Sequence, residues 1–111
     1  MEKPKIFFYI WHDEKYYKEL SEFLDLTISD DIPKNLEGFS EVILHSPGVK
    51  SLVDILTQTK KRNIPTIYQI EHKSLYESTM EFLESGNLSY DNLHCVKIYD
   101  KLVEKAREIF L

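Results

Sequence analysis

The stretch EVILHSPGVKSLVDILTQTKKRNIPTIYQIEH, residues 41–72, decides the fold of this chain. It contains an apolar run, an amphipathic segment and a second apolar run, and it predicts a strand, a helix and a strand. The first run, Val42-Ile43-Leu44, has no polar alternation, which is typical of a strand buried on both faces of a parallel sheet. Two such strands joined by one helix are expected to be parallel, with a right-handed crossover.

The middle segment carries the signals that begin and end a helix. Ser46 suits the N-cap, and Pro47 suits the first turn, where a missing N–H costs nothing. Positive charge at residues 60–62 complements the helix dipole in the last turn. Asn63 is predicted to end the helix in a left-handed conformation.

The same alternation continues on both sides of this stretch. Strands are predicted at residues 5–11, 42–44, 66–70 and 94–99, with a further short strand open at 26–29. Helices are predicted from Asp13 to about Asp25, from the capping box Ser74-x-x-Glu77 to Gly86, and from a cap at Asp100 onward. Strands alternating with helices indicate an α/β fold. We expect a single open, doubly wound (Rossmann-like or flavodoxin-like) sandwich over residues 1–111, with four to five mainly parallel strands and helices on both faces.

Composition excludes several classes of function. The 111 residues are 42% hydrophobic, which is enough for one core, and the net charge is −5, which disfavours a nucleic-acid partner. No apolar run approaches the roughly 20 residues of a membrane helix, and no signal peptide is recognisable, so we expect a cytoplasmic protein without a membrane partner. The single cysteine, Cys95, excludes an intramolecular disulfide and is interpreted as an inert core residue.

Ligands of doubly wound sheets bind outside the carboxyl ends of the strands, so the residues that follow the predicted strands are the candidates for a site. Polar residues at these positions are His12, Asp13, His45, Ser46, Glu71 and His72. Histidines beside carboxylates serve as acid–base groups or metal ligands, but polar residues also end strands and cap helices for structural reasons. The three histidines lack the short spacing of a metal motif, so no metal site is predicted. No glycine-rich loop follows the first strand, and the sequence identifies no cofactor.

The stretch FSEVILHSPGVKSLVDILTQTKKRNIPTIYQIEHKSLY, residues 39–76, resembles the acceptor-side half of retaining glycosyltransferases with two Rossmann-like halves. The final segment HCVKIYDKLVEKAREIF is similar to a later strand and helix of that family. The resemblance implies that His72 is the polar contact to the transferred sugar, with Glu71, His45 and Ser46 in the cleft. It also implies a sugar or nucleotide-sugar ligand. The chain lacks the nucleotide-binding half, so we expect it not to be a complete enzyme by itself.

A second resemblance covers the first strand and helix. The segment FFYIWHDEKYYKELSEFLDL is similar to the start of response-regulator receiver domains, and Asp13 and Glu14 match their metal-holding acids. His45 and Ser46 stand where the family has its phosphoacceptor aspartate. This resemblance therefore implies a receiver-shaped interaction domain without phosphoryl transfer.

Two classes of function stay open. The first is a glycosyltransferase-like half-domain that binds a sugar or nucleotide-sugar at the carboxyl edge, beside a partner protein. The second is a non-catalytic, receiver-like interaction or regulatory module. Both are compatible with a homodimer, since small domains rich in aromatic residues often cover apolar surface by self-association.

Overall fold

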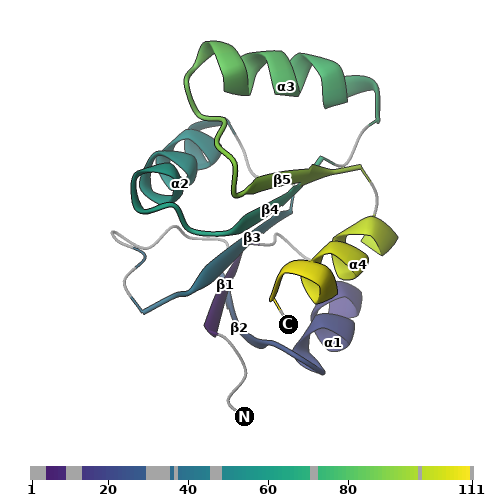
Figure 1. The fold of residues 1–111 in the computed structure, drawn as a ribbon. Coiled ribbons are helices and arrows are strands. Elements are labelled where there is room, and N and C mark those ends of the chain that lie inside the picture. The colour runs from purple at the N-terminus through teal and green to yellow at the C-terminus, as the bar shows by residue number, and fades with distance from the viewer. Residues whose placement is uncertain are drawn as a thin grey trace.

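The computed structural model describes residues 5–9, 14–29, 36, 38–45, 49–70, 73–97 and 99–110. Figure 1 shows the described strands stacked in one sheet with helices on both sides. In chain order the elements are β1 (Lys5–Tyr9), α1 (Glu14–Ser21), β2 (Asp25–Ser29), β3 (Glu41–His45), α2 (Val49–Arg62), β4 (Thr66–Gln69), the 3₁₀ turn η1 (Lys73–Leu75), α3 (Tyr76–Ser85), β5 (Leu93–Val96) and α4 (Tyr99–Phe110).

The sheet has the strand order β2-β1-β3-β4-β5, and every neighbouring pair is parallel. This confirms the predicted doubly wound α/β fold, and the short strand that the sequence left open at 26–29 forms as β2. β2 lies on one side of β1, and β3, β4 and β5 follow one another on the other side. β2 and β5 are the two edges of the sheet.

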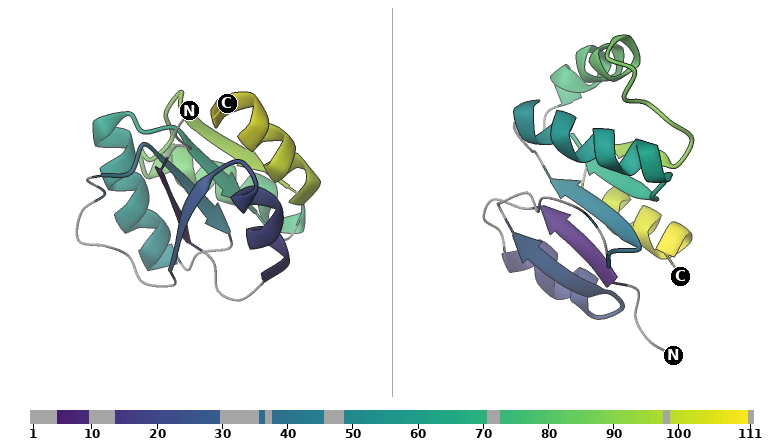
Figure 2. Two further views of the ribbon diagram at one scale, coloured as in Figure 1. Left: turned by 90° about the horizontal axis from the view of Figure 1, so that it is seen from below. Right: turned by 90° about the vertical axis from the view of Figure 1, so that its left-hand side faces the viewer.

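The central strands divide their side chains between two cores, which explains why their sequence shows no alternation. In β1, Phe7 and Tyr9 join the core beneath α2 and α3, whereas Ile6 and Phe8 join the core beneath α1 and α4. In the two views of Figure 2, α2 lies on one side of the sheet and α1 and α4 on the other. All four side chains are buried.

The central helix follows its sequence signals closely. Leu52, Ile55 and Leu56 of α2 are buried against the sheet, and the cationic residues 60–62 form its last turn. Asn63 has a φ of 54°, which confirms the predicted left-handed end of the helix.

Several element boundaries differ from the sequence prediction, including that of the last strand, which ends at Val96 rather than at residue 99. α1 ends at Ser21 rather than near Asp25, because β2 already begins at Asp25. In the turn between them, Phe23 N and Leu24 N both donate to Leu20 O, and Leu20 and Leu24 are buried. The predicted capping box does not form, since a 3₁₀ turn precedes α3 and Leu75 occupies the N-cap without a side-chain cap. α4 already begins at Tyr99, so Asp100 is its second residue rather than the residue before it, as the prediction had it.

The amino ends of β4 and β5 are tied together by side-chain hydrogen bonds. The Tyr90 hydroxyl lies 2.8 Å from the Ile64 carbonyl oxygen and 2.8 Å from Thr66 Oγ1. Asn92 Nδ2 donates to the carbonyl oxygen of Asn63 at 3.2 Å. Burial is the main cause that raises the pKa of Tyr90, so its hydroxyl stays protonated at neutral pH.

A second tie links the end of α2 to the end of α3. Lys60 Nζ donates to the carbonyl oxygen of Asn87 at 2.7 Å and to Asn87 Oδ1 at 2.8 Å. Asn87 has a φ of 57°, whereas Gly86 before it has a φ of −83°, so the left-handed residue after α3 is the asparagine. None of the helices in the described part of the chain has the length and apolarity needed to cross a membrane.

Candidate functional site

The strand order places the candidate site at the carboxyl ends of β1 and β3. In doubly wound sheets a crevice opens where the order reverses, and here the reversal lies between β1 and β3. His45 is the last residue of β3 and therefore lies at this reversal of strand order. The other predicted site residues, His12, Asp13, Ser46, Glu71 and His72, lie outside the residues that the structure describes.

His45 has a polar neighbour that the sequence analysis did not single out. It is in register with Gln69, the last residue of the adjacent strand β4. His45 follows Ile43 by two residues and Gln69 follows Ile67 by two, and both isoleucines belong to the core beneath α1 and α4. Because side chains alternate along a strand, His45 and Gln69 extend side by side from this same face.

Gln69 is the unusual member of this pair. The side chain is only 4% exposed, yet its Oε1 is buried without a hydrogen-bond partner among the described residues. On the other side Gln69 is in register with Val96 of β5, an apolar residue that has no side-chain donor to offer. A buried amide oxygen without a donor costs about 1–3 kcal/mol, and an ordered water or a ligand can supply the missing donor.

The sequence contained one signal that pointed to Gln69. In the run Thr66-Ile67-Tyr68-Gln69-Ile70 the glutamine is the one amide among residues predicted to be buried. A buried amide at the carboxyl end of a parallel strand is a binding-site candidate on physical grounds. Gln69 was missed because the whole run was interpreted as apolar.

The described residues at this edge of the sheet, His45 and Gln69, can form hydrogen bonds with a ligand. Gln69 offers an amide oxygen as acceptor, and His45 is half-buried next to it. Among the described residues, no group of three or more histidine, cysteine, aspartate and glutamate side chains has the arrangement of a metal site. Such an edge is suited to hold hydroxyl and N–H groups of a polar ligand.

The opposite face of the sheet holds no reactive thiol among the described residues. Burial raises the pKa of the Cys95 thiol to about 11, and it raises the pKa of the neighbouring Tyr68 hydroxyl to about 12. Both groups therefore stay protonated at neutral pH. A thiol with this pKa is a poor nucleophile, in agreement with the interpretation of Cys95 as a core residue.

A separate open groove of about 490 Å³ runs beside the edge strand β5. It is lined by Cys95 and Val96 of β5, by Tyr76 and Lys97, and by four charged residues of α4. Lys97 Nζ lies 4.5 Å from the centre of the Tyr76 ring, which is a cation–π contact at one end of the groove. Neither His45 nor Gln69 lines this groove, so it is distinct from the candidate site.

Comparison with known protein families, with characterised proteins and with solved structures gives no match for this chain. The candidate site is therefore described by its own geometry alone.

Proposed function

We propose that this domain binds a hydroxyl-rich small molecule, a sugar or nucleotide-sugar, at the carboxyl ends of β3 and β4. The observation that supports the proposal is the buried Gln69 Oε1, which has no donor while it lies beside His45. A sugar hydroxyl donates one hydrogen bond to the amide oxygen and accepts others from neighbouring donors. Ligand binding then removes the cost of the unsatisfied oxygen, which adds to the affinity.

The resemblance of residues 39–76 to the acceptor side of glycosyltransferases supports the same ligand class. On that resemblance His72 is the polar contact to the transferred sugar, and Glu71, Ser46 and His45 belong to the cleft. His12 and Asp13 follow β1 in the sequence and are proposed to complete the site from the other side of the switch point. The proposal concerns binding, and a partner protein supplies a donor site if transfer takes place.

The test is a comparison of two glutamine variants. Isothermal titration calorimetry with UDP-glucose, and separately with glucose, measures binding to the wild-type chain, to Gln69→Leu and to Gln58→Leu. Gln58 is a half-buried glutamine of α2, so its substitution makes the same chemical change away from the site. We expect binding to weaken by at least about tenfold in Gln69→Leu, because a hydrogen bond to a buried group is lost.

The control variant should bind like the wild type. Equal binding by Gln69→Leu and the wild type, or no binding of either compound by the wild type, contradicts the proposal. His72→Ala extends the test to the residue that the family resemblance selects, and we expect a loss of binding without loss of the fold.

A second candidate function is a non-catalytic, receiver-like interaction or regulatory module. The strand order β2-β1-β3-β4-β5 favours it, because receiver domains use this flavodoxin-like order. This candidate predicts that neither sugar compound binds and that a partner protein or a second copy of the chain binds instead.

A further inference from the structure

The groove beside β5 lies at an edge of the sheet that no described strand covers. β5 pairs with β4 on one side only, and an edge strand exposes unpaired N–H and C=O groups that can bind another strand. Leu93, His94 and Cys95 are half-buried rather than buried. The groove of about 490 Å³ gives access to this edge between Tyr76 and the outer side of α4.

The outer side of α4 carries charges in a regular order. Lys101, Glu104, Lys105 and Glu108 form one stripe, since residues three and four apart share a helix face. These four residues line the groove, and their side chains are 62%, 67%, 34% and 66% exposed. Within the helix, Lys101 Nζ lies 3.2 Å from Glu104 Oε2, and Lys105 Nζ lies 3.6 Å from Glu108 Oε1.

This stripe is complementary to itself in one orientation only. When a second copy of α4 lies antiparallel and centred between Glu104 and Lys105, Lys101 meets Glu108 of the other copy, and Glu104 meets Lys105. Every cross-copy pair is then of opposite charge. A parallel copy in the same register brings each residue against itself, so every pair is of like charge, which disfavours that arrangement.

The midpoint of β5 and the midpoint of the charged stripe on α4 lie at similar distances from the turn that joins them. The midpoint of β5 lies between His94 and Cys95, about 8 Å before Lys97, since strands rise about 3.3 Å per residue. The midpoint of the charged stripe lies about 8 Å after Tyr99, since helices rise about 1.5 Å per residue. A single two-fold axis perpendicular to the sheet therefore passes near both midpoints.

The position of α4 over the sheet fits the same axis. α4 contacts both β4 and β5, so it lies on one face of the sheet along the open edge. When two β5 strands pair across the axis, the two α4 helices come to lie on the same face of the joined sheet, on either side of the axis. Strand pairing and helix packing are thus satisfied by one arrangement.

We propose that the groove beside β5 binds a second copy of this chain, with the two β5 strands paired antiparallel and the two α4 helices packed side by side. The interface is isologous, as in most two-fold dimers. Paired backbone groups of β5 and the apolar surface of Val96 and Tyr76 supply the attraction. Exposed ion pairs contribute little to affinity, so the charged stripe acts mainly by selecting the antiparallel orientation.

Charge reversal tests the proposal in the whole chain. Sedimentation velocity across a range of concentrations measures the dimer dissociation constant of the wild type, of Glu108→Lys and of the double variant Lys101→Glu/Glu108→Lys. The single variant sets like charges against each other at two symmetric contacts, so we expect the dissociation constant to rise at least about tenfold. The double variant restores opposite charges across the axis, so we expect most of the affinity to return.

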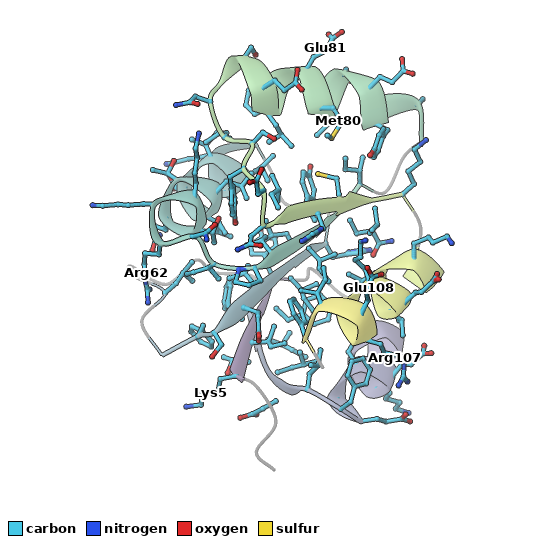
Figure 3. All side chains as sticks on the ribbon, viewed as in Figure 1. Lys5, Arg62, Met80, Glu81, Arg107 and Glu108 are labelled. Carbon is cyan, nitrogen blue, oxygen red and sulfur yellow. The ribbon has the colours of Figure 1, made fainter. Side chains whose placement is uncertain are left out.

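The double variant also separates contacts between copies from contacts within α4. It brings like charges together within both intrahelical pairs, so it is worse than the single variant if only the stability of α4 matters. Glu81→Lys is the matched control, because Glu81 is exposed on α3 and points away from the sheet in Figure 3. Its dimer should match the wild type.

Several results would overturn the proposal. A wild-type chain that stays monomeric at all concentrations excludes a second copy, and leaves the groove to a peptide of another protein. A dimer that Glu108→Lys does not weaken, or that Glu81→Lys weakens equally, places the interface elsewhere. Failure of the double variant to recover affinity, with circular dichroism showing intact helices, excludes the antiparallel arrangement.

Discussion

The two ends of the parallel sheet treat buried polar groups in opposite ways. At the amino end, the Tyr90 hydroxyl bonds to Thr66 and to the Ile64 carbonyl. At the carboxyl end, Gln69 Oε1 is buried but has no hydrogen-bond partner among the described residues. Thr66 is the first residue of β4 and Gln69 is the last, so the two polar groups lie at opposite ends of the same strand.

Under the proposed function, the amino end of the sheet serves stability and the carboxyl end serves binding. A network in which every donor and acceptor is paired stabilises the fold. An unsatisfied buried group costs stability, so its presence needs another explanation, such as a function. One carboxylate at the amino end is an exception, because Glu41 Oε2 is also buried without a partner. Burial raises the pKa of Glu41, so this side chain relieves its cost by binding a proton more readily. The amide of Gln69 does not titrate, so it cannot relieve its cost by binding a proton.

The largest effect on stability is expected from Tyr90→Phe at the amino end. This substitution removes the hydroxyl that joins Ile64 and Thr66, and it leaves those acceptors with fewer donors. We expect a loss of about 1–3 kcal/mol in the free energy of unfolding, measured by urea denaturation. Tyr76→Phe is the control, since the hydroxyl of the half-buried Tyr76 has no hydrogen bond among the described residues. A similar loss of stability in both variants would contradict the prediction.

The opposite sign is expected for Gln69→Leu at the carboxyl end. Replacing an unsatisfied buried amide by an apolar group of similar size removes a cost, so stability should stay equal or rise by about 1–2 kcal/mol. The same urea series measures this change, with Gln58→Leu as the matched variant. A loss of more than about 1 kcal/mol in Gln69→Leu would mean that the amide is well satisfied and would remove the contrast between the two ends.

A smaller effect is expected at the tie between α2 and α3. Lys60→Met removes two hydrogen bonds to Asn87, but the side chains are exposed to water, so the expected loss is about 0.5–1 kcal/mol. Thermal unfolding measures it. Lys61→Met makes the same change at an exposed position in the same turn, and the prediction does not hold if both variants lose equal stability.

The smallest effect is expected from Glu41→Gln, and it depends on pH. A carboxyl group whose pKa is higher in the folded state destabilises the fold as pH rises from its ordinary pKa through the folded one. The variant should therefore be more stable than the wild type at pH 7, by less than about 1 kcal/mol because the side chain is only half-buried.

The advantage of Glu41→Gln should disappear below about pH 4, where the carboxyl is protonated in both states. Thermal unfolding at several pH values measures this dependence. A stability difference that does not change with pH would show that the charge of Glu41 is not its cause.

The sequence predicted the fold because apolar runs and helix signals are local. Val42-Ile43-Leu44 and the cationic end of α2 each identify their element within a few residues, and the parallel arrangement follows from their order. Element boundaries were less predictable, since Leu20 and Leu24 are both buried in a tight turn that ends α1 early. Tertiary packing decides such boundaries, and local patterns do not report it.

The candidate site was predictable in place but not in detail. The topology indicated the carboxyl edge, and His45 does lie at the end of β3. Gln69 escaped notice because its significance depends on burial and on the lack of a partner, and neither can be seen in a sequence. The register between His45 and Gln69 comes from pairing two strands that are more than 20 residues apart, which only the folded chain shows.

We propose that the carboxyl ends of β3 and β4 form the binding site, and amide NMR during titration with UDP-glucose can detect binding there residue by residue. We expect the amide signals of His45, Gln69 and their neighbours to shift as the compound is added. The amides of Thr66 and Asn92 at the amino end should stay unchanged. Shifts confined to the amino end, or no shifts at all in a folded sample, would contradict the account.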